Sequence, residues 1–222
     1  MDFNDLAKGS DQLVKFLHVP TGTRVEFPAF ITEYTDTYTV SWGSEQVYGR
    51  MDPIKPYTGT TRQISIAFDV VAPSLARARE NMANYGKLIQ MLYPVYSEPL
   101  KTGGAKGRTL KSPPFLRIHF MNLIANQSIT NPEIGLLGCI SGLGFAPNKE
   151  AGWYNDGVKL LPKIFAISFN FEPQHESELG WEGRKFLTGK FPYSQFTPEQ
   201  ATAMADSSNP NVALSRERDT LK

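Results

Sequence analysis

The sequence predicts a mainly β protein of the α+β class, with an antiparallel β-sandwich or rolled sheet, one long flanking helix and extended loops or arms. Several short segments alternate apolar and polar residues, which is the period of a half-buried strand. One longer stretch places its apolar residues three and four positions apart, which is the period of an amphipathic helix. The 18 glycines and 16 prolines stand largely between short apolar runs, as in β domains with many turns.

Four segments are predicted as core strands. The runs from Ile64 to Val70 and from Phe165 to Phe171 alternate strictly, so one face of each should be buried, and the second run is expected to be central. The run from Phe115 to Met121 alternates less cleanly. Leu136 to Phe145 is apolar but glycine-rich, which predicts a strand with bulges or a close approach of another backbone.

A hairpin is expected near the N-terminal end. Apolar residues alternate from Thr23 to Ile31, and the pattern returns from Tyr38 to Trp42 after the polar stretch Thr32 to Thr37, which is predicted to connect the two strands. Pro28 has no amide proton, so the first strand is expected to lie at an edge or to carry a bulge there.

One helix is predicted from Leu75 to Leu92. Its apolar or small residues recur at spacings of three and four, and Ser74 is the expected N-cap. Pro94 should end the helix because it lacks an amide donor and disfavours helical geometry at the preceding residue.

Chain length and periodicity predict one domain over residues 1–196, with an N-terminal arm (1–20) and a projecting loop (43–61). A chain of 222 residues fits one large domain. Residues 197–222 show no periodicity, which predicts a C-terminal arm that is ordered only by partners.

Composition limits the partners. The 23 basic and 22 acidic residues give a net charge of +1, so no bulk field attracts nucleic acid or an anionic membrane. Met1 to Ser10 is acidic rather than signal-like, and no apolar stretch approaches a membrane span, so we expect a soluble protein made in the cytoplasm. Cys139 is the one cysteine and has no disulfide partner in the chain.

The residue patterns predict no enzyme, no cofactor and no metal site. His175 has the acidic neighbours Glu176 and Glu178, but HESE lacks the ligand spacing of a zinc hydrolase, which favours a solvated acidic turn. Cys139 stands in an apolar, glycine-rich run, which is typical of an inert thiol. The run from Gly138 to Gly144 lacks the lysine and hydroxyl residue of a phosphate-binding loop.

A basic loop follows the helix, with Lys101, Lys106, Arg108 and Lys111. Such a loop could bind phosphates or an acidic partner. A solvated loop is the favoured interpretation, because no aromatic residue lies within it to stack bases.

The most distinctive motif precedes the strand at Ile64. Its candidate interface residues are Tyr48, Gly49, Arg50, Asp52, Pro53, Tyr57 and Arg62. One interpretation is a long hairpin connection, in which Gly49 and Pro53 fix the turns and Arg50 meets Asp52 or solvent. The other is an interface arm, because tyrosine and arginine combine large contact area with directional hydrogen bonds.

Three segments resemble tail tube and baseplate proteins of tailed bacteriophages, including initiators that join the baseplate hub to the tail tube. They are FPAFITEYTDTYTVSW, VYGRMDPIKPYTGTTRQISIAFDV and ENMANYGKLIQMLYP, within residues 27–96. The likeness is strongest at Gly49, Arg50, Asp52, Pro53, Tyr57, Thr60 and Arg62. It implies a tail-tube-like sandwich or rolled sheet flanked by a helix.

The resemblance also implies a structural virion protein of the tail baseplate, assembled in the host cytoplasm. Its subunits would form a sixfold ring that binds other hub and tail tube proteins and nucleates tube assembly. DNA could pass through the central channel without specific binding. A sheet shared around such a ring leaves no free edge, which removes an aggregation hazard.

Two other functions stay open. One is a tail tube protein of a phage or of a related contractile injection system, which would form long tubes alone. The other is a cell-wall (peptidoglycan) binding or lytic baseplate component, which would need a sugar-binding groove and, for hydrolysis, a pair of catalytic carboxylates.

Overall fold

The computed structural model describes residues 12–97, 108–126, 135–183, 185–186 and 193. Over these residues the protein is mainly β, with a large antiparallel sheet and one helix, which confirms the predicted fold class. The predicted C-terminal arm (197–222) and the part of the basic loop with Lys101 and Lys106 lie outside the described residues.

The chain forms two compact units. The ribbon unit comprises Pro28–Leu92 and Gly138–Pro173. The second unit comprises the described parts of Met1–Phe27, Tyr93–Leu137 and Gln174–Lys222.

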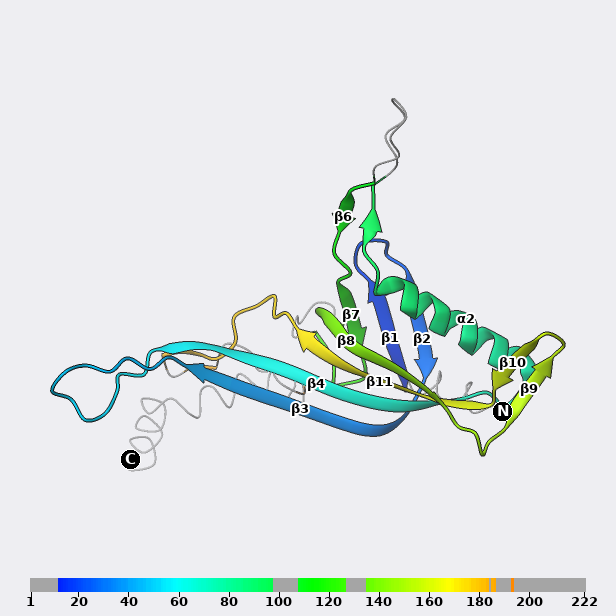
Figure 1. The fold of residues 1–222 in the computed structure, drawn as a ribbon, viewed down its shortest axis with the longest axis horizontal. Coiled ribbons are helices and arrows are strands. Elements are labelled where there is room, and N and C mark those ends of the chain that lie inside the picture. Colours follow the sequence, from blue (N-terminus) through cyan, green and yellow to red (C-terminus); the bar gives the residue numbers. More distant parts are fainter. Residues whose placement is uncertain (1–11, 98–107, 127–134, 184, 187–192, 194–222) are drawn as a thin grey trace, which may run out of the picture. The chain divides into compact units, whose positions relative to one another are not determined.

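The ribbon unit holds the longest strands and the helix (Figure 1). Its elements are β3 (Phe30–Trp42), β4 (Tyr57–Val71), α2 (Leu75–Met91), most of β8 (Leu136–Pro147), β9 (Trp153–Asp156), β10 (Lys159–Pro162) and β11 (Ile164–Pro173). Four strands lie side by side in the order β8-β11-β4-β3, and each neighbouring pair is antiparallel. The central position predicted for the strand at Phe165 is thus confirmed.

The second unit is built from shorter strands. They are β1 (Leu13–His18), β2 (Arg24–Pro28), β5 (Val95–Tyr96), β6 (Leu110–Ser112), β7 (Leu116–His119), β12 (Trp181–Glu182) and β13 (Lys185–Phe186). β1 pairs antiparallel with β7 and lies within residues 1–20, for which the sequence predicted an arm. The rings of buried Phe16 and Phe27 meet edge to face, with centroids 6.1 Å apart.

Alternation along β4 and β11 produces the buried face of the ribbon unit. Ile64, Phe68 and Val70 have no exposed surface, and the facing residues of β11 are equally buried. The rings of Phe68 and Phe169 meet edge to face, with centroids 6.4 Å apart. Each side chain of this size contributes about 1.5–3 kcal/mol through burial, so the inner part of β4 is strongly held.

The helix begins and ends where the sequence predicts. The Ser74 side chain accepts a hydrogen bond of 3.3 Å from the amide of Arg77, and Leu92 is the C-cap. The ring of Tyr85 stacks on Phe145 of β8 at a centroid distance of 4.8 Å. The helix therefore packs on the same face of the sheet as the buried residues of β11.

A short hairpin, β9–β10, extends the helix packing. Gly157 adopts a φ of 65° in the turn between the two strands. Tyr154 and Leu161 pack into a small cluster with residues of α2. The guanidinium of Arg79 donates a hydrogen bond of 2.8 Å from Nε to Oδ2 of Asp156, which ties the hairpin to the helix at an exposed position.

The glycines of β8 explain its predicted irregularity. A Cβ at Gly138 would lie 2.3 Å from the carbonyl oxygen of Glu172, so only glycine allows this approach. Farther along, β8 has one more residue than β11 beside Phe169, and Gly142 stands at this bulge with a φ of 66°. Both expectations for the strand are confirmed.

The predicted hairpin within residues 23–42 is wrong. β3 runs without interruption from Phe30 to Trp42, and Thr32 to Thr37 belong to the strand rather than to a connection. Threonine is β-branched and suits a strand, and polar residues are stable here because β3 pairs with β4 while one of its faces lies in solvent.

Candidate interaction surface

The two longest strands continue beyond the core as a ribbon. We call residues 38–62 the outer ribbon; they comprise the ends of β3 and β4 and the loop between them (Figure 1). Residues 30–36 and 64–71 form the inner part of the same strand pair. Along β4, Arg62 is the first buried residue, so the outer ribbon begins where burial ends.

The register of the ribbon depends on two bulges in opposite strands. Between the pairs Ile31–Phe68 and Glu33–Ala67, β3 has one extra residue, Thr32. Between the pairs Ser41–Gly59 and Trp42–Tyr57, the extra residue is in β4 and is Thr58. Because the two extra residues are in opposite strands, their effects cancel. The pairing is offset by one residue only between the two bulges, and the register is the same on either side of them.

The outer ribbon has one apolar face that is exposed. Its residues are Tyr38, Val40, Trp42 and Tyr57. Trp42 and Tyr57 are each 58% exposed, and their rings meet edge to face with centroids 5.5 Å apart. The hydroxyls of Tyr57 and Thr60 are hydrogen-bonded at 2.7 Å. Aromatic side chains in this position supply large contact area at low cost in conformational entropy.

The opposite face of the ribbon is small and polar. Its residues are Thr35, Thr37, Thr39, Ser41, Gly59, Thr61 and Gln63. Nearer the core, the same face of the sheet extends across β11 and β8, where it includes serine, alanine, glycine and asparagine side chains. The charged side chains at its strand positions are the acids Glu33, Asp69 and Glu172, so the described face is polar and weakly acidic.

The loop at the tip is a narrow extension of the ribbon. Glu45 and Ile54 exchange backbone hydrogen bonds, and the amide of Gly43 donates to the carbonyl of Pro56. At the end, Gly49 takes a φ of 83°, a left-handed conformation that favours glycine. The side chains of Tyr48 and Met51 extend fully into solvent at this turn. The tip thus offers two large apolar side chains.

Arg62 and Asp36 form a buried ion pair at the base of the outer ribbon. Their side chains are 3% and 2% exposed. Arg62 Nε donates to Asp36 Oδ1 at 3.0 Å, and Nη2 donates to Oδ2 at 2.6 Å. Burial by itself lowers the pKa of Arg62, but the hydrogen bonds and charge of Asp36 outweigh it and raise that pKa.

Tyr38 completes this network. Its hydroxyl donates to Oδ2 of Asp36 at 3.1 Å, and the guanidinium carbon of Arg62 lies 5.4 Å from the centre of its ring. The arginine is therefore held by a carboxylate and by an aromatic face within the same chain.

The structure divides the seven sequence-predicted interface residues into three places. Tyr48, Gly49, Arg50 and Asp52 are exposed around the tip, with Pro53 half-buried beside them. Tyr57 lies on the apolar face, and Arg62 lies in the ion pair at the base.

Sequence reasoning missed Val40, Trp42 and Asp36 as parts of this surface. Their signal is present as a period of two from Tyr34 to Trp42, which would have shown one continuous strand. The pairing of Asp36 with Arg62, 26 residues away, has no such signal.

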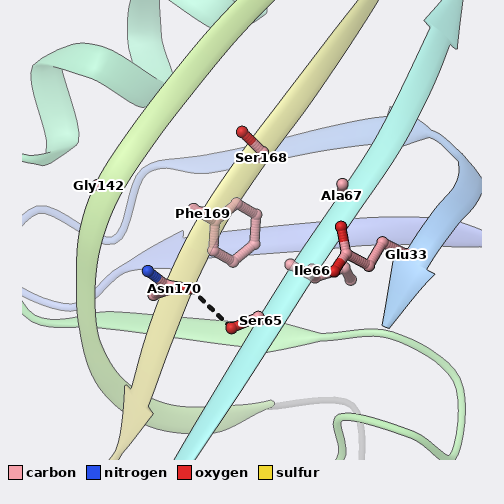
Figure 2. A pocket seen from close by; sticks show the side chains of 8 residues that line it. All are labelled: Glu33, Ser65, Ile66, Ala67, Gly142, Ser168, Phe169 and Asn170. Carbon is pink, nitrogen blue, oxygen red and sulfur yellow. Dashed lines mark hydrogen bonds between the residues drawn. The ribbon is translucent and has the colours of Figure 1, made fainter. Parts of the chain in front are cut away.

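An open hollow of about 250 Å³ lies on the polar face of the sheet (Figure 2). It is lined by Glu33, Ser65, Ile66, Ala67, Gly142, Ser168, Phe169 and Asn170. The Ser65 hydroxyl donates a hydrogen bond of 2.7 Å to Oδ1 of Asn170, and Glu33 is the ionisable residue of this lining. A single carboxylate beside amide and hydroxyl groups does not form an acid–base pair.

The cysteine and the acidic residues that the sequence analysis considered as reactive or metal-binding groups have structural roles or surroundings in the fold. Cys139 lies in β8, where burial, followed by the charge of Glu172, raises the pKa of its thiol. Glu176 binds Arg117, with Nη1 donating to Oε2 at 2.7 Å, and this bond lowers the pKa of the carboxyl group. Within the described residues no group of three or more metal-binding side chains converges, and no helix is long and apolar enough to span a membrane.

The sequence matches no protein-family model and no curated protein. Among solved structures, the chain is similar to the Dit protein (gp 19.1) of phage SPP1, at 10% identity and a TM-score of 0.36. That match covers 72% of this chain and 49% of the Dit chain, so it spans about half of the Dit protein.

A chain of the anti-feeding prophage (AFP) baseplate is also similar, at 11% identity and a TM-score of 0.29. The match covers 72% of this chain and 87% of that one. The Dit protein belongs to a hub adsorption apparatus, and the second chain belongs to a baseplate.

Proposed function

We propose that this chain is a structural protein of a phage tail baseplate, whose copies associate into a ring that joins the baseplate hub to the tail tube and nucleates tube assembly. The exposed apolar face of the outer ribbon carries the proposal. Large aromatic side chains that are exposed on a pair of strands are typical of a surface that a partner covers.

The edge of the sheet supports association between copies. β3 is the last strand in the order of the ribbon unit and is 13 residues long. Its outer end, residues 38–42, contains no proline and no charged residue, which are common protections of an exposed edge. A neighbouring copy that paired with residues 39–42 of β3 would extend the sheet, as in a sheet shared around a ring.

The polar face of the sheet suits the lining of a channel. Its small side chains leave little to obstruct passage, and its carboxylates would repel a phosphate backbone. DNA could therefore pass without specific binding. Tyr48 and Met51 at the tip, and Arg50 and Asp52 beside them, would contact a neighbouring subunit or an adjacent hub or tube protein.

The test is the oligomeric state of the purified protein, measured by light scattering after size exclusion and by negative-stain electron microscopy. Rings of uniform size are expected for the wild type. Long tubes formed by the protein alone would instead favour a tail tube protein, and monomers at every concentration would contradict ring formation.

Edge pairing can be tested separately with Thr39→Pro and Val40→Pro. Consecutive residues of an edge strand direct their amides to opposite sides, so one of the two prolines removes an amide that points away from β4. That variant should remain folded but lose the ring. Val158→Ser, at a fully exposed position in the β9–β10 turn, is the matched control and should keep the ring.

Contacts at the tip are tested with Arg50→Ala and Asp52→Ala. Both positions are exposed, so the monomer should stay folded while ring formation or stacking weakens. Unchanged assembly in both variants would remove these two residues from the proposed interface.

A further inference from the structure

We propose that the Asp36–Arg62 ion pair keeps the outer bulge of β4 on the tip side of Arg62, and thereby sets the register and direction of the outer ribbon. Arg62 and Asp36 are then positioning residues and not contacts to a partner. This inference rests on the proposed function only for its effect on assembly, because the register is a property of the isolated chain.

The sequence on either side of the outer bulge provides little other information about register. β4 reads Thr58, Gly59, Thr60, Thr61 before Arg62, and β3 places the small polar residues Thr39 and Ser41 opposite Thr61 and Gly59. Register is weakly specified where strands are repetitive and polar, so the extra residue could be any of several in this stretch. A bulge at Thr58 and one nearer Arg62 would expose similar side chains.

The ion pair distinguishes these arrangements. In the observed register Tyr38 is opposite Arg62 and Asp36 is opposite Ile64, so Asp36 and Arg62 lie diagonally on one face. If the bulge moved inward past Arg62, Thr37 would be opposite Arg62. The guanidinium would then lie on the threonine face, away from Asp36.

Such a shift would break every contact that Arg62 makes in the network. The hydrogen bonds from Arg62 to Asp36 and the contact of its guanidinium with the Tyr38 ring would all be lost. Asp36 would keep its buried face without the arginine, and a buried charge without its partner is strongly unfavourable. The pair therefore disfavours every register in which the bulge lies on the inner side of Arg62.

The position of the bulge matters because a bulge bends its strand and increases the local twist. Beyond Thr58 the chain continues through Tyr57 to the tip. A displaced bulge would direct Tyr48 and Met51 differently while leaving their exposure unchanged. Assembly would then fail even though every contact residue is present.

Disulfide trapping in the monomer tests the register directly. In a Cys139→Ser background, Thr39→Cys with Thr61→Cys reports the observed register, because these residues are Cα partners. Thr39→Cys with Thr60→Cys reports the shifted register, because Thr60 now faces the other side, opposite Val40. The ratio of the two crosslinks after mild oxidation is measured by mass spectrometry.

With the ion pair intact, the crosslink from 39 to 61 should predominate. Asp36→Thr, which makes position 36 the same as its neighbours Thr35 and Thr37, should shift the ratio toward the crosslink from 39 to 60 by at least about tenfold. Arg62→Met should do the same. Exchanging the charges, with Asp36→Arg and Arg62→Asp together, should restore the original ratio.

The matched control is Asp156→Asn, which removes the exposed ion pair to Arg79 in the same unit and should leave the ratio unchanged. An unchanged ratio in folded Asp36→Thr and Arg62→Met variants would overturn the inference, whatever their oligomeric state. A shifted ratio in a protein whose wild type never assembles would support the register role and contradict the proposed function.

Discussion

The inner and outer parts of β3–β4 differ sharply although they belong to the same two strands. In the inner part, Ile64, Phe68 and Val70 are fully buried and β4 lies between β3 and β11. In the outer part, Trp42 and Tyr57 pair with each other and are more than half exposed. The same alternation of residues thus serves a core at one end and an exposed surface at the other.

This contrast separates folding from association. Burial on folding stabilises the inner part, whereas the exposed aromatic side chains of the outer part gain little from folding of the monomer. Substitutions in the inner part should therefore change the free energy of unfolding. Those in the outer part should mainly change assembly.

The largest effect is expected for Phe68→Ala. The side chain is fully buried against Phe169, so its removal leaves a cavity and should lower the free energy of unfolding by about 3–5 kcal/mol. Chemical denaturation of the monomer measures this change. A loss below about 1 kcal/mol would mean that the inner part is not the stabilising core.

The next effect is expected for Gly138→Ala, which tests close packing of β8 against β11. The added methyl group would meet the carbonyl oxygen of Glu172 and the ring of Phe171, so the strands must separate at a cost of about 1–3 kcal/mol. Thermal unfolding followed by circular dichroism is the measurement. An unchanged melting temperature would contradict the close approach.

Trp42→Ala should have a different signature. We expect less than about 1 kcal/mol of change in monomer stability, because the indole is exposed, but a loss of about 2 kcal/mol or more in association. Denaturation and light scattering on the same sample separate the two. If assembly is unaffected while the monomer is strongly destabilised, the aromatic pair is part of the fold and not of an interface.

The smallest effect is expected for Gly59→Ala, the counterpart of the β8 glycine in the outer ribbon. A Cβ at Gly59 meets no atom within 4 Å, so stability should change by no more than about 0.5 kcal/mol. Denaturation under the conditions used for Gly138→Ala gives a direct comparison. A large loss would show that the polar face of the ribbon is more constrained than its packing indicates.

Sequence patterns were sufficient to predict an element wherever the periodicity of one segment determines its structure. The strict alternation at Ile64 to Val70 and the Ser74 cap of the helix are both found as predicted. The glycine-rich run also forms the predicted bulged strand, because a side chain at Gly138 would clash with Glu172 and Gly142 has a left-handed backbone conformation that favours glycine.

The remaining features depend on relations between distant residues. From the sequence alone, the polar stretch Thr32 to Thr37 resembles a connection between strands. Its pairing with β4, which is distant in the sequence, makes it part of a strand. The register follows from two compensating extra residues in different strands, and no single segment contains that information. Arginine is a residue type that interfaces favour, so the sequence suggests an interface role for Arg62. Only the distance between Arg62 and Asp36 in the structure reveals the intramolecular contact.

Because the bulge at Thr32 lies far from the end of the ribbon, a small change in its bend would move the outer ribbon by a large distance. Trp42 lies ten positions beyond Thr32, which at about 3.3 Å per residue corresponds to an arm of about 33 Å. A change of about 10° at that bulge would displace the far end by about 6 Å. A substitution at the base can therefore alter the reach of the protein without touching any residue at its far end.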